Sequence, residues 1–257
     1  MASRSMETGR MGSMAAGSVR SRNNVNTFGD PRGRPIMFAH GLASTQRMWS
    51  DVAPEFPDHA VVLFDLIGSG ESDPDAYDPI RYDSLHGHAD DVLVIIDELG
   101  LADIVYVGHS VAGIIGALAA IREPEPFSAL VLVDASPRYL NDVGYGGGLD
   151  LCDIEQLVAV MDVDLATQTD HANDPRRLDA SRHFARVALG CDHRRDLSGI
   201  VTPTLLLHCT ADPMVPPAVA RYMHAAIPGS TLVVMSGSSA TLGTTIELGI
   251  HIRAHVR

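Results

Sequence analysis

The stretch IVYVGHSVAGIIGA, residues 104–117, determines the predicted fold. A β-branched apolar run comes first, a turn with Ser110 at its tip follows, and an apolar segment with helical spacing comes last. This order is typical of a nucleophile elbow, a strained strand–turn–helix that exposes a serine hydroxyl. The turn needs small neighbours, and Gly108, Ala112 and Gly113 are small, although the usual G-x-S-x-G pattern has glycine where Ala112 stands. A plain β–α turn with serine as a helix N-cap is the alternative interpretation.

Apolar strands alternate with helical patterns along the rest of the chain. Besides the elbow strand, the predicted strands are residues 35–39, 60–65, 129–133, 203–208 and 231–235. Besides the elbow helix, the predicted helices are residues 46–55, 85–99, 217–227 and a final helix ending near 257. Strands that are apolar throughout indicate a parallel sheet covered on both faces. Right-handed crossovers then give a doubly wound, mostly parallel α/β domain.

The sequence predicts one domain with an insertion. Residues 1–22, rich in Met, Ser, Gly and Arg, are expected to form a disordered leader. Residues 23–136 and 200–257 carry the strand–helix alternation and form the predicted core. Residues 137–199 show no strand pattern but contain two helical patterns, so we expect a helical cap over one end of the sheet. The two patterns cover residues 153–161 and 177–190.

Charge, the length of apolar runs and cysteine content limit the partners and the location that the sequence allows. The formal net charge of −13 argues against binding to nucleic acid or an anionic membrane surface, because both need a basic face. No apolar run reaches the roughly 18–20 residues that span a bilayer. The three cysteines are an odd number and form no C-x-x-C, which favours a reducing compartment and a cytoplasmic protein.

Two short patterns that resemble metal or cofactor motifs carry little weight. His86 and His88 fall on a predicted helix, where residues two apart point roughly 200° away from each other around the axis, so they cannot chelate one metal. The Gly108-x-Ser110-x-x-Gly113 pattern is not in the first β–α turn, where dinucleotide folds carry their glycine motif. The twelve histidines form no recognised ligand spacing. We therefore predict neither a metal nor a cofactor.

The chemistry is expected at the carboxyl ends of the strands, where ligands bind in such sheets. A serine hydrolase of this type has its triad in the order Ser, Asp or Glu, His. Ser110 as nucleophile and Asp212 as acid fit that order, although a turn aspartate is the alternative for Asp212. The backbone N–H groups of Val111, after the serine, and Leu42, after His40-Gly41, are the predicted oxyanion donors.

Four segments carry a family resemblance. FAHGL at 38–42, VLFDLIGSG at 62–70, YVGHSV at 106–111 and ASPRYLND at 135–142 resemble one α/β-hydrolase subfamily. That subfamily contains the bacterial stress regulator RsbQ and the plant strigolactone and karrikin receptors. The similarity covers roughly residues 22–235.

The resemblance implies an apolar pocket under a helical lid, a Ser–His–Asp triad that slowly cleaves small ester or enol-ether ligands, and a protein partner in signalling. It places His40, His109 and Tyr139 at the substrate pocket. The cap of this chain is shorter than that of the family by one helix's worth.

The chain departs from the family at the triad histidine. The family has G-H-x-x-H-L after the last strand, whereas this chain has GSSATL at 237–242, so that Ser238 stands at the histidine position. A serine hydroxyl has no useful proton affinity near pH 7 and cannot act as a general base. Of the other histidines, His208 is the best substitute, because His251 and His255 lie far along the final helix.

Two functions follow from these residues. The first is a weak serine hydrolase of small apolar esters or lactone-like molecules. The second is a catalytically impaired ligand-binding protein of signalling, which keeps the pocket and has lost turnover. Ser238 favours the second function, and the elbow with Asp212 favours the first.

Overall fold

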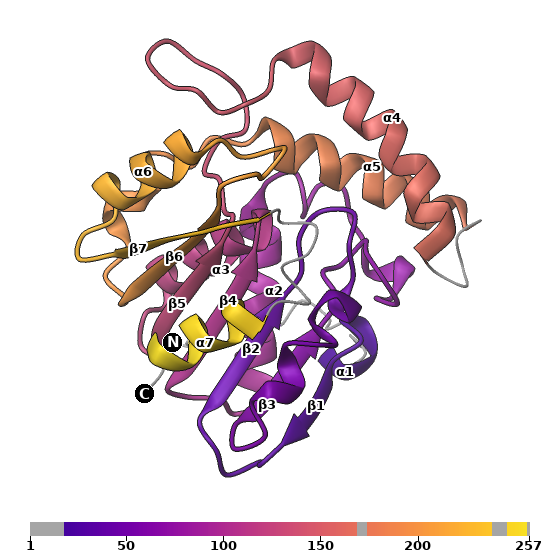
Figure 1. Ribbon diagram of the computed structural model, residues 1–257. Coiled ribbons are helices and arrows are strands. Elements are labelled where there is room, and N and C mark those ends of the chain that lie inside the picture. The colour runs from indigo at the N-terminus through magenta and orange to yellow at the C-terminus, as the bar shows by residue number, and fades with distance from the viewer. Residues whose placement is uncertain (1–17, 169–173, 238–245, 256–257) are drawn as a thin grey trace, which may run out of the picture.

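The computed structural model describes residues 18–168, 174–237 and 246–255. Seven strands form one sheet in the order β1-β3-β2-β4-β5-β6-β7 (Figure 1). All neighbours pair in parallel except β1, which runs antiparallel to β3. The strands are β1 Asn26–Gly29, β2 Pro35–Ala39, β3 Ala60–Phe64, β4 Ile104–His109, β5 Phe127–Val133, β6 Thr204–Cys209 and β7 Thr231–Met235. The predicted doubly wound, mostly parallel α/β fold is confirmed.

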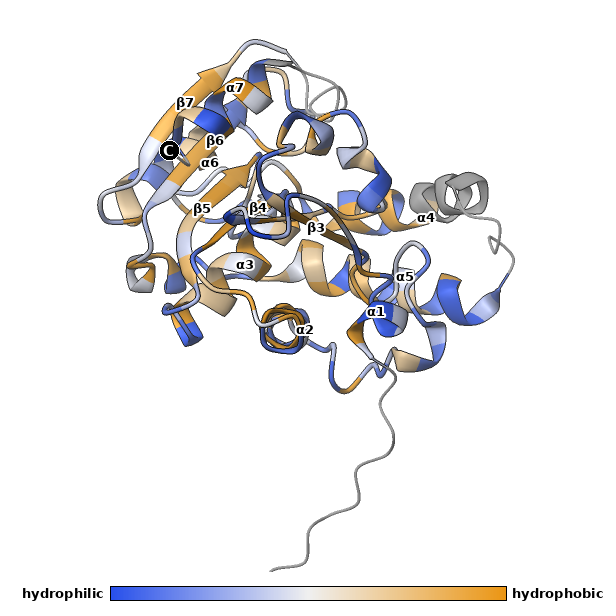
Figure 2. Ribbon diagram, turned by 90° about the horizontal axis from the view of Figure 1, so that it is seen from below, coloured by the Kyte–Doolittle hydropathy of each residue, from blue (hydrophilic) through white to orange (hydrophobic). Residues whose placement is uncertain are grey.

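Helices cover both faces of this sheet. Figure 2 shows apolar strands between α2 and α3 on one side and α7 on the other. The α-helices are α1 Val19–Arg22, α2 Leu85–Glu98, α3 Val111–Arg122, α4 Leu151–Gln168, α5 Pro175–Gly190, α6 Pro217–Ala226 and α7 Ile246–His255. Short 3-10 helices are η1 Gln46–Trp49, η2 Ala53–Glu55, η3 Pro74–Ala76 and η4 Asp196–Gly199.

Two buried clusters divide the core by sheet face. The larger one joins α2 and α3 to alternate residues of the strands, and it continues into the cap through Phe184 and Leu189. The other joins the remaining strand residues to η1, η2 and α7, with Trp49 and Leu248 fully buried. Because side chains of a strand alternate between faces, each apolar strand supplies both clusters.

The cap lies over one end of the sheet, as α4 and α5 show in Figure 1. These two helices correspond to the two helical patterns predicted within residues 137–199. The N-terminus of α5 is capped by Asp174, whose carboxylate accepts the N–H of Arg176 at 3.0 Å, and Pro175 occupies the first turn. Among the described residues, no helix is both long and apolar enough to cross a membrane.

Part of the predicted leader is ordered, which corrects the boundary at residue 22. Residues 1–17 lie outside the described residues, but Val19–Arg22 form α1. Val19 is buried against α2 and donates its N–H to Glu98 at 3.1 Å, and Arg22 forms an ion pair with the buried Asp91 at 3.1 Å. These contacts order a segment whose composition alone predicted disorder.

Two further expectations need correction. The helix predicted over residues 46–55 is a pair of 3-10 turns, because Pro54 lacks the N–H that a continuous α-helix requires there. Strand β1 was not predicted, since all four of its residues are exposed and no apolar pattern marks it.

Candidate active site

Ser110 lies at a strained turn between β4 and α3. Its backbone has φ 54° and ψ −125°, in the left-handed region that few residues other than glycine adopt. Its N–H donates to the carbonyl of Val133 on the neighbouring strand at 2.8 Å. A Cβ on Gly108 would lie 2.6 Å from the carbonyl oxygen of Ala112, so only glycine fits beneath the turn. The predicted strand–turn–helix is confirmed, with the backbone geometry of a nucleophile elbow.

A small cavity is lined by residues from both core segments, 23–136 and 200–257, and from the cap. Its volume is about 140 Å³, comparable to cavities that hold one benzene-sized molecule. Six of the predicted site residues line it: Leu42, His109, Ser110, Val111, Tyr139 and Asp212. Four further residues complete the lining: Ala188, Leu189, Met214 and Val215. Positions 110 and 212, distant in the chain, therefore face one space at the carboxyl ends of β4 and β6.

Asp212 is held by its own turn. One carboxylate oxygen, Oδ1, accepts the backbone N–H groups of Met214 and Val215, each at 2.7 Å. Bonds of this kind are those of a turn aspartate, which was the alternative to the catalytic interpretation. They fix the orientation of the carboxylate toward the cavity without occupying its second oxygen. The turn interpretation is confirmed by these bonds, and the role of Asp212 as the acid of a triad stays a prediction.

Tyr139 is the hydrogen-bond partner of the Ser110 hydroxyl among the residues that the structure describes. The two oxygens are 2.8 Å apart. Burial raises the pKa of Tyr139 above its usual range, so the phenol is neutral at physiological pH. A neutral phenol can orient the serine hydroxyl, but it cannot remove the proton as a general base.

His109 lines the cavity with its ring nitrogens buried and without hydrogen-bond partners among the described residues. Burial lowers the pKa of His109, although the nearby carboxylates of Asp134 and Asp212 act in the opposite direction. The imidazole packs closely against Gly41, where an added Cβ would lie 2.5 Å from Nδ1. The glycine of the His40-Gly41 pair is therefore required by the approach of this ring.

His40 does not line this cavity, contrary to the expectation that it contributes to the substrate pocket. Its side chain is fully buried, Nε2 accepts the N–H of Leu66 at 3.0 Å, and Nδ1 lies 2.8 Å from the carbonyl oxygen of Gly41. Because Nε2 accepts, the hydrogen bonds assign the proton to Nδ1. Desolvation lowers the pKa of His40 and keeps it neutral. The residue supports the loop that carries Leu42.

Neither the predicted triad-histidine position, Ser238, nor the proposed substitute base, His208, is placed at the cavity by the described residues. Ser238 lies outside the described residues, and its place at the triad histidine position remains a prediction. His208 on β6 is buried, with Nδ1 3.2 Å from the Asp134 carboxylate, and it is not among the residues that line the cavity. In the described part of the chain, no group of three or more His, Cys, Asp or Glu residues is placed to hold a metal ion.

The sequence did not predict that residues of the cap line this cavity. Ala188 and Leu189 at the end of α5 line the cavity. Helical periodicity marks them as core residues, but it does not tell which part of the sheet the cap covers. Met214 and Val215 had a usable signal, because they directly follow the candidate acid Asp212.

Comparisons with known proteins agree with this geometry. A sequence model described as the alpha/beta hydrolase fold matches residues 34–157. A probable esterase of Oryza sativa subsp. japonica is 34% identical over 247 residues, which cover 88% of this chain and 91% of the relative. A strigolactone esterase of Arabidopsis thaliana is 36% identical over 220 residues, 78% of this chain and 82% of the relative.

Among solved structures, a hydrolase from Oleispira antarctica superposes with a TM-score of 0.80 at 29% identity. The match covers 92% of this chain and 95% of that one. The chain belongs to the α/β-hydrolase fold family. Within that family it is homologous to plant strigolactone esterases and to karrikin insensitive 2 receptors such as one of Petunia hybrida, to which it is 33% identical over 242 residues.

Proposed function

We propose that the protein is a slow serine hydrolase of small apolar esters or lactone-like molecules. The observation that carries the proposal is the strained Ser110 at one cavity with Asp212. The cavity volume of about 140 Å³ limits the reacting portion of the substrate to the size of one small ring. The apolar lining from Leu189, Met214 and Val215 favours a neutral substrate.

The proposed reaction begins with attack of the Ser110 oxygen on the ester carbonyl carbon. A carbon–oxygen bond forms, and the carbonyl electron pair moves to the oxygen, which becomes an oxyanion. The N–H groups of Leu42 and Val111 are its proposed donors, and Val111 is the first residue of α3, where amide hydrogens lack partners within the helix. The carbonyl then re-forms as the ester carbon–oxygen bond breaks, and the leaving alkoxide takes a proton from water and departs as the alcohol. A second water adds to the acyl-serine carbonyl, and the bond to the Ser110 oxygen breaks to release the acid and the serine hydroxyl.

The weak step is removal of the serine proton. With serine at position 238, the proton passes to water instead of an imidazole, so acylation is slow. Asp212 then has no imidazole to orient at that position, which makes its contribution electrostatic. This step explains why we expect turnover to be low while ligand binding is retained.

The second candidate function is a ligand-binding protein of signalling that acts with a protein partner. Ser238 favours it, and so does the bond between Tyr139 and the Ser110 hydroxyl, which occupies the nucleophile. Three free cysteines, Cys152, Cys191 and Cys209, fit a reducing compartment, and we place either function in the cytoplasm.

Labelling and turnover separate the two functions. A fluorophosphonate probe should label the wild-type protein at Ser110, and p-nitrophenyl acetate should be hydrolysed slowly. Ser110→Ala is the control and should lose both signals. Absence of labelling and turnover in the wild type, together with thermal stabilisation by small apolar ligands, would reject the hydrolase in favour of the binding protein.

A further inference from the structure

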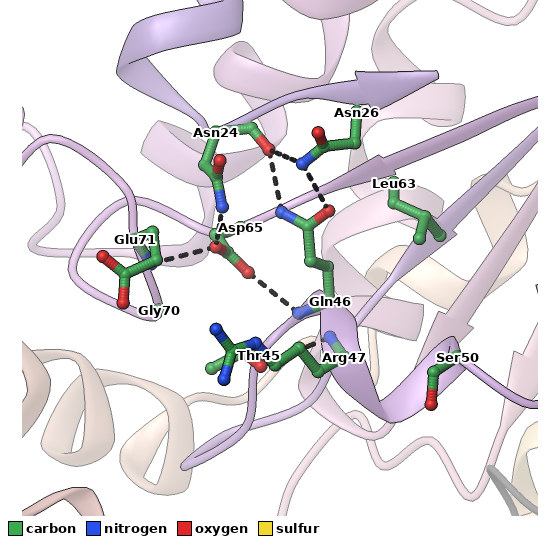
Figure 3. A pocket seen from close by; sticks show the side chains of 10 residues that line it. All are labelled: Asn24, Asn26, Thr45, Gln46, Arg47, Ser50, Leu63, Asp65, Gly70 and Glu71. Atoms are coloured by element: carbon green, nitrogen blue, oxygen red, sulfur yellow. Dashed lines mark hydrogen bonds between the residues drawn. The ribbon is translucent and has the colours of Figure 1, made fainter. Parts of the chain in front are cut away.

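Asp65 is a buried carboxylate at the carboxyl end of β3, two strands away from the elbow strand β4. Its side chain is 1% exposed. Oδ1 accepts the N–H of Gln46 at 2.8 Å, and Oδ2 accepts the side-chain amide of Asn24 at 2.8 Å and the N–H of Glu71 at 3.0 Å. Figure 3 shows the carboxylate at the meeting point of these three segments. A buried carboxylate group that accepts this many hydrogen bonds is fixed in position.

The segment between His40 and Gln46 is held at both ends by groups around Asp65. At its start, His40 accepts the N–H of Leu66, the residue after Asp65, and Nε2 lies 3.7 Å from the Asp65 carboxylate. At its end, the N–H of Gln46 is bonded to the carboxylate itself. Leu42, which lines the cavity beside Ser110, lies between these two anchors.

The loop between the anchors is strained. Ala43 has φ 51°, in the left-handed region that is unfavourable for a residue with a Cβ. Such a conformation persists only where the surroundings hold it. The two anchors supply that restraint next to the residue whose N–H is the proposed oxyanion donor.

We propose that Asp65 is a positioning residue that fixes the Leu42 N–H for oxyanion binding. It acts through Gln46 and His40 and does not touch the substrate. The inference rests on the proposed function only in taking Leu42 as an oxyanion donor. We expect its effect to be largest on a bound oxyanion, because most of the apolar wall, including Leu189, Met214 and Val215, comes from other elements.

Gly70 offers a second way to move the same carboxylate. It has φ 55°, and an added Cβ would lie 2.5 Å from the Asp65 carboxylate. Gly100 is a matched control, since it has φ 61° and no atom within 4 Å of an added Cβ in the part of the chain that the structure describes. Gly70→Ala and Gly100→Ala therefore introduce similar backbone strain, and only the first displaces Asp65.

Asp65→Asn tests the carboxylate directly. An amide presents one oxygen and one NH₂ group, so in either orientation a donor faces a donor, at Gln46 on one side or at Asn24 and Glu71 on the other. Asn24→Gly is a milder variant that removes one donor at a residue whose φ of 47° suits glycine. Ser50→Ala alters the wall of the cavity in Figure 3, about 440 Å³ in volume, at a side chain that bonds neither Asp65 nor Gln46 in the described part of the chain.

The experiment compares two probes of similar shape by titration calorimetry on folded variants. Phenylboronic acid forms a bond from boron to the Ser110 oxygen, releases the hydroxyl proton to water and places a boron oxygen at the oxyanion site. Benzyl alcohol forms no adduct. Asp65→Asn and Gly70→Ala should weaken the boronate by about tenfold, less than the loss of an entire donor. Asn24→Gly should weaken it less, and Gly100→Ala and Ser50→Ala should not change it.

Affinity for benzyl alcohol should stay unchanged in all five variants. Equal loss for both probes, no loss for the boronate, or a wild type that binds no boronate would each overturn the proposal. A wild type that binds the boronate but does not hydrolyse p-nitrophenyl acetate would refute the hydrolase function and leave this comparison valid.

Discussion

The Ser110 hydroxyl is bonded to a phenol that holds it without accepting its proton. Tyr139 lies 2.8 Å away and is kept neutral by burial, which raises its pKa. A nucleophile in this state is oriented but not activated. In the proposed function, hydrolysis therefore depends on a proton acceptor, and we predict that position 238 is where that acceptor is missing.

Ser238→His should restore the missing base. We expect kcat/KM for p-nitrophenyl acetate to rise by about 10²- to 10⁴-fold, the usual contribution of a positioned general base. Ser239→His is the adjacent control and should leave the rate near that of the wild type. An unchanged rate in a well-folded Ser238→His variant would contradict the assignment of position 238 to the triad.

Tyr139→Phe should free the serine hydroxyl. Loss of one hydrogen bond of about 1 kcal/mol predicts labelling by a fluorophosphonate that is faster by about fivefold. The measurement is the second-order labelling rate at fixed pH, with Tyr145→Phe as a control, because the Tyr145 hydroxyl donates to the Arg138 carbonyl and not to Ser110. Slower labelling would mean that Tyr139 helps to activate the serine.

At the scale of single residues, the sequence predicted which side chains meet, while their catalytic roles stay predictions. Ser110 and Asp212 were predicted from a turn motif and a strand end, and the structure brings them to one cavity. His40 was misplaced because the His-Gly pattern says that the pair is needed but not which of the two faces the ligand. Its buried ring bonds to backbone groups, which no side-chain pattern encodes.

At the scale of elements, α3 packs against β4 through a glycine. A Cβ on Gly116 would lie 2.0 Å from the ring of Tyr106, whose hydroxyl donates to the Ala112 carbonyl at 3.0 Å. Since both the ring and the helix are buried, neither can move without opening the core. This close approach sets the distance between the elbow helix and the sheet.

Gly116→Ala should lower the free energy of unfolding by about 2 kcal/mol through overpacking. Gly249→Ala in α7 is the matched helical control, because an added Cβ there meets no atom of the described residues within 4 Å. It should raise stability by about 0.5–1 kcal/mol through helix propensity. Urea unfolding checks both, and equal effects of the two substitutions would contradict the packing argument.

Elements with an apolar pattern were predictable, and the misses have physical causes. The strands that became β2 to β7 are apolar along most of their length and therefore stand out as apolar runs. Strand β1 is held mainly by backbone pairing to β3, which side-chain patterns do not reveal. The helix α1 has four residues, too few for periodicity, and depends on long-range contacts to α2.

At the scale of the whole molecule, buried neutral histidines make stability sensitive to acid. Both ring nitrogens of His88 are buried without partners among the described residues, between the rings of Tyr82 and Phe184. Burial lowers the pKa of His88 from its usual 6.5 to about 3. Below pH 6.5 the unfolded chain binds a proton that the folded chain does not, so stability falls as the pH falls toward 3.

His88→Phe should flatten this dependence. The slope of the unfolding free energy between about pH 6 and pH 4 should decrease by up to about 1.4 kcal/mol per pH unit, the value for one proton. Urea unfolding at several pH values gives the slope. A variant that is as sensitive to acid as the wild type would contradict this role for His88.

The place of the cap in the strand order has an evolutionary consequence. Strands β5 and β6 are hydrogen-bonded neighbours, yet the whole cap lies between them in the chain. The chain therefore leaves the sheet after β5 and returns to it at β6, the adjacent strand. Because these two strands stay paired whatever lies between them, a cap of different length requires no change in strand pairing. Related proteins can therefore differ in the length and sequence of the cap, and so in the ligands that they bind, while they keep the same sheet and the same turn at Ser110.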